Sequence, residues 1–163
     1  MDRAQSGGDG DHERVIAEVL AARGHLQGAL IPVLNGIHDR LGFLPPPTVE
    51  LVARGLNLSR AEVHGVITFY HDYRNHPPGK HVLKLCRAEA CQSMGANELV
   101  AHMKHRHGLE LHATTADGAL TLEQVFCLGN CACSPAAMID GRLVGRVTTD
   151  TLDALVRDPE GGP

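Results

Sequence analysis

The chain of 163 residues contains no tryptophan, and aromatic residues make up only 3% of it. A surface of stacked aromatic side chains, the kind that grips single-stranded nucleic acid, is therefore not available. Positive charge is also scarce, because 15 Lys and Arg residues stand against 19 Asp and Glu residues, for a net charge of −4. Proteins that bind duplex DNA normally carry an excess of positive charge. We therefore expect no nucleic-acid partner.

Long apolar runs are missing as well. No segment approaches the ~18 apolar residues that a membrane span requires, and the longest apolar stretch, residues 29–34, fits a buried helical turn. Residues 1–10 have no apolar run, so we expect a disordered tail rather than a secretory signal. These features predict a cytoplasmic protein without a membrane span. Because reducing compartments rarely keep structural disulfides, the five cysteines point to chemistry rather than to cross-links.

The first half of the chain has the apolar spacing of helices. Residues 11–73 predict a helix that Gly24 ends, followed by helices over about 26–41, 48–54 and 59–70. Ser59 and Glu62 have the spacing of a capping box at the start of the last of these. Prolines and glycine in the segment 75–79 predict a linker. We therefore expect a helical domain with its linker over 11–78 and a second domain over 79–163.

The pattern changes after the linker. Alternating apolar residues predict strands at 81–86, 109–114 and 120–127, and a hairpin of 137–139 and 143–147 around Asp140 and Gly141. Helices are predicted from about Ala96 to Gly108 and over 149–157. This succession matches a small thioredoxin-like α/β sandwich. The whole chain is thus predicted to be α+β, an N-terminal helical bundle followed by a thioredoxin-like domain.

Four cysteines fall into two pairs, Cys86-x4-Cys91 and Cys127-x3-Cys131, with 35 residues between the pairs. Each pair follows a predicted strand, so the two loops can converge at one edge of a sheet. Thiolates are soft ligands that suit zinc or iron–sulfur clusters. The Cys-x2-Cys spacing that structural zinc sites and thioredoxin-type redox sites usually have is absent. The wide loops therefore favour a four-thiolate 2Fe–2S site.

Three segments resemble one known family: CRAEACQSMG at 86–95, CLGNC at 127–131 and EVHGVITFY at 62–70. They look like the thioredoxin-like 2Fe–2S ferredoxin family, which includes the small 2Fe–2S subunits of NADH:quinone oxidoreductase (complex I), NAD-reducing hydrogenases and formate dehydrogenases. The resemblance covers about residues 15–156. It implies one 2Fe–2S cluster held by Cys86, Cys91, Cys127 and Cys131. Cys133 is a fifth cysteine outside the family's spacing, and we expect it to pack beside the site.

Within this family, CRAEACQSMG and DGRLVGRV at 140–147 look most like the gamma subunit of NAD-dependent molybdenum formate dehydrogenase. The resemblance implies an electron-transfer subunit of that oxidoreductase, with no catalytic residue and no substrate-converting site of its own. Its partners would be a subunit that binds FMN and NAD(H) and a molybdenum-containing catalytic subunit. The same module in NADH:quinone oxidoreductase or in an NAD-reducing hydrogenase is the alternative.

Two further patterns allow other interpretations. Residues 48–54 and 59–70 have the outline of a helix-turn-helix, which together with a cluster would suggest an iron–sulfur redox-sensing DNA-binding regulator. The second of these helices offers only Arg60 as a cation, and its apolar face requires a protein core or a protein partner. His102, His105 and His107 cluster on one predicted helix. We expect them to form a solvated helix face rather than a zinc site.

Overall fold

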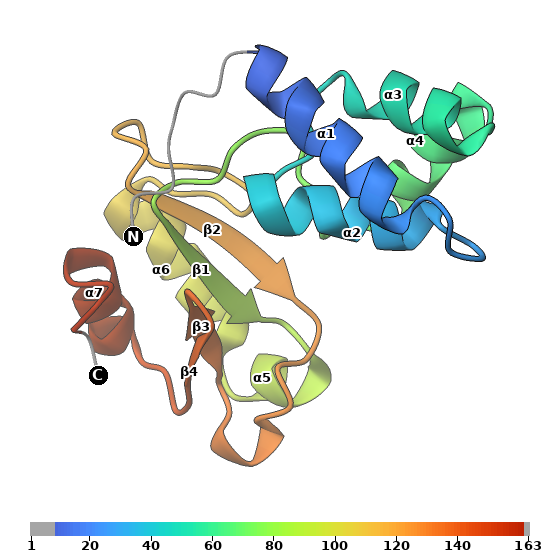
Figure 1. The fold of residues 1–163 in the computed structure, drawn as a ribbon. Helices are drawn as coiled ribbons and strands as arrows, with labels where there is room; N and C mark the ends of the chain where they lie inside the picture. Colours follow the sequence, from blue (N-terminus) through green and yellow to red (C-terminus); the bar gives the residue numbers. More distant parts are fainter. Residues whose placement is uncertain (1–8, 162–163) are drawn as a thin grey trace. The chain divides into compact units, whose positions relative to one another are not determined.

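The computed structural model describes residues 9–161 and separates the chain into two compact units, Met1–Pro77 and Pro78–Pro163 (Figure 1). We call these the helical unit and the sheet unit. The disordered tail expected at residues 1–10 lies outside the described residues, except that Asp9 and Gly10 begin the first helix. Within the described ranges of both units, no helix combines the length and the apolar character needed to cross a bilayer.

The helical unit contains four helices: α1 (Asp9–Arg23), α2 (Leu30–Leu41), α3 (Thr48–Leu56) and α4 (Arg60–Phe69). They enclose one core whose most deeply buried side chains include Ile16, Val33, Leu34, Ile37, Val52 and Val63. Val63 and Ile67, which give α4 its apolar face, both belong to this core. The apolar face of α4 is therefore explained by packing inside its own unit.

Two helix boundaries in this unit differ from the prediction. α2 begins at Leu30 rather than near residue 26, because Gly28 has φ of +68°, which a right-handed helix does not allow. α3 continues through Gly55, and Asn57 takes the left-handed conformation that ends it. Gly55 meets a packing need instead, since a Cβ atom there would lie 2.9 Å from the side chain of Leu20.

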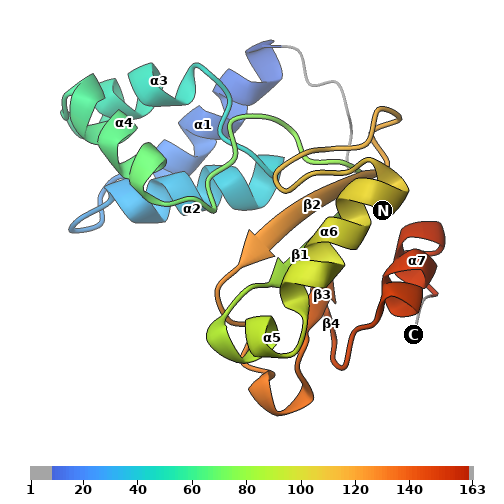
Figure 2. The same ribbon diagram turned by 180° about the vertical axis from the view of Figure 1, so that it is seen from behind.

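The sheet unit contains the strands β1 (His81–Cys86), β2 (Leu120–Val125), β3 (Ala137–Ile139) and β4 (Arg142–Val144), in the order β2-β1-β3-β4. β1 pairs with β2 in parallel, and the other two pairs are antiparallel. The helices are α5 (Glu89–Ser93), α6 (Ala96–His107) and α7 (Thr149–Arg157), with a 3-10 turn, η1, at Cys131–Cys133. The observed α+β architecture, with α6 crossing the sheet (Figure 2), confirms the predicted fold class.

Side-chain alternation places the core of the sheet unit on one face of the sheet. Leu83 and Leu85 of β1 lie opposite Ile139 and Ala137 of β3, and all four are buried. The same core contains side chains from both long helices, namely Leu99, Met103, Leu152 and Leu155. α6 and α7 therefore cover the same face of the sheet.

The predicted strand at 109–114 is wrong. In this segment the structure has a single isolated bridge between Thr114 and Thr121, because His112 has φ of +64° and interrupts the extended backbone. Leu109, Leu111 and Ala113 still turn inward against the core, which accounts for the alternation in the sequence. The five-residue helix α5 was not predicted, and β4 is shorter than the 143–147 expected.

The capping box at the start of α4 is present. Ser59 Oγ accepts a hydrogen bond from the Glu62 backbone N–H at 3.2 Å. In return, the backbone N–H and the hydroxyl of Ser59 donate to Glu62 Oε2 at 2.8 and 2.7 Å. These hydrogen bonds from Ser59 lower the pKa of the Glu62 carboxyl.

We predict that Ser59→Ala lowers the free energy of unfolding of the helical unit by about 1 kcal/mol, the typical cost of removing a serine N-cap. Arg60→Ala on the same helix is the control and should change it by less than about 0.5 kcal/mol. Urea unfolding of the full chain, followed by far-UV circular dichroism, measures both. Equal unfolding midpoints for Ser59→Ala and the wild type would contradict the prediction.

Candidate metal centre

Parallel pairing of β1 and β2 brings the two cysteine loops to one edge of the sheet. Cys86 is the last residue of β1 and lies opposite Val125, the last residue of β2. Cys127 follows two residues later with φ of +106°, so the chain turns sharply at this point. Cys91 lies in α5, and Cys131 is the first residue of η1.

The four cysteines predicted from the sequence lie within interaction range of one another. Cys127 Sγ and Cys131 Sγ are 3.9 Å apart. The proximity of Cys127 raises the pKa of the Cys131 thiol, and the charges of Cys91 and Cys86 raise it further. Thiolates that interact in this way repel one another, so a cation that they share would stabilise the group.

Ser134 links the two loops. The Cys91 thiol donates to Ser134 Oγ at an S···O distance of 3.6 Å. The Ser134 hydroxyl in turn donates to the backbone carbonyl of Cys131 at 2.7 Å. No pattern in the sequence indicates this role, since Ser134 lies beyond the cysteine motif.

Backbone N–H groups face the sulfur atoms. Burial opposes ionisation of Cys86, but hydrogen bonds from the Ala88 N–H, the Cys91 thiol and the N–H groups of Leu128 and Cys127 lower its pKa overall. The Gly129 N–H donates to Cys127 Sγ at 3.3 Å. The loops therefore stabilise negative charge on sulfur, as an anionic metal–thiolate centre requires.

The site is buried on one side and open on the other. Cys86 and Cys91 are 2% and 1% exposed, and they pack with the small side chains of Ala96 and Ala136. Cys127 and Cys131 are exposed. The large apolar side chains of Met94 and Phe126, 61% and 72% exposed, flank the two loops.

Cys133 is partly buried at the end of η1. A Cβ atom built at Gly145 would lie 2.7 Å from Cys133 Cβ and 2.7 Å from Asn130 Nδ2. The Cys133 carbonyl accepts a hydrogen bond from the Arg146 backbone N–H at 2.6 Å. Close packing against the segment after β4 therefore fixes the position of Cys133.

The donor set fits a 2Fe–2S cluster, which four cysteine thiolates typically ligate. The four sulfur atoms belong to two loops, and backbone N–H groups donate to the sulfur atoms of Cys86 and Cys127. Small buried side chains pack beneath the cysteines. Bound in this way, such a cluster would have one buried and one exposed side.

Comparisons with known proteins identify a family whose description includes a 2Fe–2S centre. The family model described as Thioredoxin-like [2Fe-2S] ferredoxin matches residues 16–160. A subunit of the NADH-quinone oxidoreductase of Pseudomonas aeruginosa is 33% identical over 130 residues, which cover 80% of this chain and 78% of the relative. The HndA subunit of the NADP-reducing hydrogenase of Solidesulfovibrio fructosivorans is 28% identical over 145 residues, covering 89% and 85%.

Solved structures show the same fold. The structure of an NAD+-reducing [NiFe]-hydrogenase in the air-oxidized state aligns with a TM-score of 0.57 at 21% identity. The alignment covers 88% of this chain and 22% of the hydrogenase chain.

We predict that Gly145→Ala weakens this site, because the added methyl group would press on Cys133 and Asn130. Overpacking of this kind typically costs about 1–3 kcal/mol, so we expect an iron–sulfur cluster reconstituted under anaerobic conditions to be lost several-fold faster. The decay of visible absorbance measures the loss. Gly65→Ala in α4 is the control, since a Cβ there would meet no atom within 4 Å. Equal decay rates in the two variants would contradict the prediction.

Proposed function

Because the chain belongs to the thioredoxin-like 2Fe–2S ferredoxin family, we propose that it is an electron-transfer subunit with one 2Fe–2S cluster ligated by Cys86, Cys91, Cys127 and Cys131. The convergence of these four thiols at the end of two parallel strands is the observation that supports the proposal. A bound 2Fe–2S cluster supplies a site for one electron at a time.

Different residues of the chain have different roles at such a site. Cys86 and Cys91, with their small buried neighbours, keep water away from the inner side. The N–H groups of Ala88 and Leu128 offset negative charge on the Cys86 sulfur. Cys127 and Cys131 lie on the exposed side, where a partner protein can approach. Electrons would therefore enter and leave through the loop 127–131.

The partner is proposed from the relatives and from the surface around the loops. Two relatives are named as subunits of an NADH-quinone oxidoreductase and of an NADP-reducing hydrogenase. We propose that this chain is the small subunit of a similar oxidoreductase complex, next to a subunit that binds FMN and NAD(H). FMN can exchange a hydride with a nicotinamide and pass on single electrons, so a one-electron site nearby is useful. Exposed Met94 and Phe126 suit the contact with that subunit.

Formate dehydrogenase is the more specific proposal. It rests on the resemblance of CRAEACQSMG and DGRLVGRV to the gamma subunit of the NAD-dependent molybdenum enzyme, and it adds a molybdenum-containing catalytic subunit as a second partner. The alternative is the same module in an NADH:quinone oxidoreductase or an NAD-reducing hydrogenase. We place the complex in the cytoplasm, where thiols stay reduced. A DNA-binding regulator is disfavoured, because α4 offers only Arg60 as a cation for contacts with DNA phosphates.

We also propose that the two units are separate domains, with the cluster in the sheet unit alone. Each unit has its own hydrophobic core, and all four proposed ligands lie after residue 78.

Replacing any one of Cys86, Cys91, Cys127 or Cys131 by Ala should lower the iron and acid-labile sulfide content from two of each per chain to well under half, because each thiolate is a ligand. Cys133→Ala is the matched control and should leave the content and the EPR spectrum of the reduced protein unchanged. Iron and sulfide analysis after anaerobic reconstitution measures the effect. Stoichiometric zinc in the wild type, with no 2Fe–2S signal, would overturn the proposal.

The subunit proposal predicts that the tagged full-length chain co-purifies with an FMN-containing protein, and that NADH reduces the cluster in the complex. Phe126→Glu should weaken this association at least tenfold at unchanged iron content, because it places a charge in the proposed contact. Leu143→Glu, a change at another exposed apolar residue of the sheet unit, is the control. A molybdenum protein in the same complex would support formate dehydrogenase, and a nickel or quinone-reducing subunit would favour the alternatives. A monomer that captures no flavoprotein would contradict the subunit proposal.

A further inference from the structure

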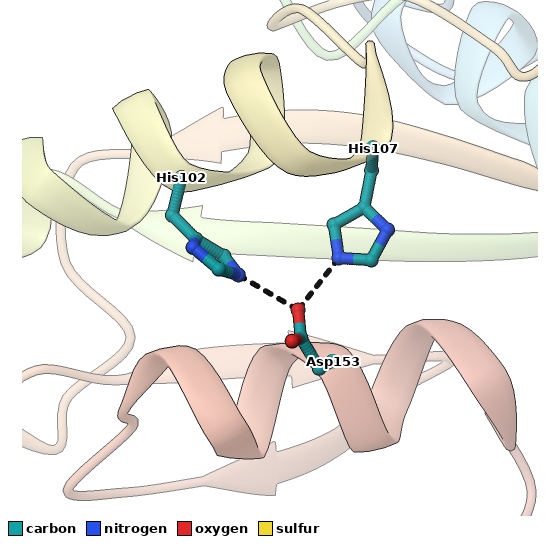
Figure 3. A group of neighbouring side chains, drawn as sticks. All are labelled: His102, His107 and Asp153. Atoms are coloured by element: carbon teal, nitrogen blue, oxygen red, sulfur yellow. Dashed lines mark hydrogen bonds and ion pairs between the residues drawn. The ribbon is translucent and has the colours of Figure 1, made fainter.

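Three polar side chains converge between α6 and α7, away from the cysteine loops. Figure 3 shows the imidazoles of His102 and His107 pointing from α6 toward the carboxylate of Asp153 on α7. Each Nε2 atom lies 2.7 Å from the same oxygen, Asp153 Oδ1. Ala96, at the other end of α6, packs with Cys86 and Cys91. His107 is therefore roughly 16 Å along the helix from the proposed cluster site, at 1.5 Å per residue.

The histidines do not all behave as the sequence predicted. His105 is exposed, as expected for a solvated helix face. The side chains of His102 and His107 are only 22% and 21% exposed, and that of Asp153 is 27% exposed. His102 and His107 are five residues apart, and side chains at that spacing on a helix point in directions that differ by about 140°. Asp153 lies on another helix. The spacing of these residues in the sequence therefore does not predict that they meet.

Two imidazoles and one carboxylate form a ligand set that zinc accepts, with three protein ligands and one open position. The three donor atoms lie within 4.8 Å of one another. At Zn–N and Zn–O bond lengths of about 2.0–2.2 Å, two tetrahedral ligands are roughly 3.3 Å apart. Each 2.7 Å hydrogen bond would thus widen by roughly 0.6 Å, which side-chain rotation can supply. The spacing of the donor atoms thus suits a metal ion, which binds once each imidazole carries its proton on Nδ1 instead of Nε2.

The charges around these three side chains also affect the binding of a metal ion. The carboxylate of Asp153 supplies a negative charge among the three side chains. A hollow of about 260 Å³ beside it is lined by Arg106 and Arg157 as well as by His107 and Asp153. The two guanidinium groups disfavour a bare cation but would favour an anionic fourth ligand, such as chloride, at the open position.

We propose that His102, His107 and Asp153 form a second metal site, which binds one Zn²⁺ or a similar divalent transition-metal ion. The ion joins α6 to α7 and so holds the C-terminal helix, whose Leu152 and Leu155 complete the core of the sheet unit. Its role is structural. The site is independent of the proposed cluster, because it shares no ligand with the cysteine loops.

The experiment titrates the full-length chain with Zn²⁺ in an isothermal calorimeter. The cysteine site is first loaded with the reconstituted cluster and loose metal is removed, so that the thiolates do not take up zinc. The wild type should bind one ion, and its thermal unfolding midpoint should rise on binding. His102→Gln and Asp153→Asn should each weaken binding at least about a hundredfold, which exceeds the usual cost of losing a group that only supports a ligand. His105→Gln removes an exposed imidazole from the same helix and should bind like the wild type.

X-ray absorption at the zinc edge identifies the ligands in the loaded wild type. We expect only nitrogen and oxygen neighbours at about 2.0–2.2 Å, whereas zinc held by cysteines would show sulfur at about 2.3 Å. A sulfur shell, equal binding by all variants, or no saturable binding by the wild type would each overturn the proposal. His107→Gln provides an independent test if either of the other variants fails to fold.

Discussion

The parallel pairing of β1 with β2 is the constraint on which the candidate site depends. Its register sets Cys86 opposite Val125, so both strands end together and the two cysteine loops leave the sheet at one edge. A shift of one residue would turn Cys86 to the other face and would also expose Leu83 and Leu85. Burial of those two leucines in the core therefore fixes the position of the first ligand pair relative to the second.

Holding four sulfur atoms close together has an electrostatic cost, and the loops are built to offset it. Proximity of Cys127 makes Cys131 harder to ionise, whereas backbone N–H groups make Cys86 easier to ionise despite its burial. Ser134 lies between the loops, since its Oγ is 3.6 Å from Cys91 Sγ and its hydroxyl donates to the Cys131 carbonyl. An electron-transfer site needs a stable cluster and a side that a partner protein can approach. The many hydrogen bonds at the inner side suit the first need, and the exposed sulfur atoms at the outer side suit the second.

Local signals in the sequence correctly predicted those structural features that depend only on residues close together in the chain. Ser59 and Glu62 form the capping box, Asp140 and Gly141 form the hairpin turn with φ of 49° and 88°, and α7 has the predicted bounds. The prediction failed where one residue or tertiary packing decides the outcome. His112 breaks an alternating segment through its backbone conformation, and α5 is too short to show a helical period. Cysteine spacing predicted the four converging thiols, but the links through Ser134 and Gly145 exist only in the folded chain.

α6 relates the two proposed metal sites to each other. Its first residue, Ala96, packs with Cys86 and Cys91, and its last residue, His107, contacts Asp153. The partial positive charge at a helix N-terminus stabilises nearby negative charge, and the partial negative charge at the C-terminus stabilises nearby positive charge. An anionic thiolate cluster at the first end and a divalent cation at the second would each meet the favourable end of the same dipole. The orientation of α6, which the β1–α6 connection determines, thus suits both sites at once.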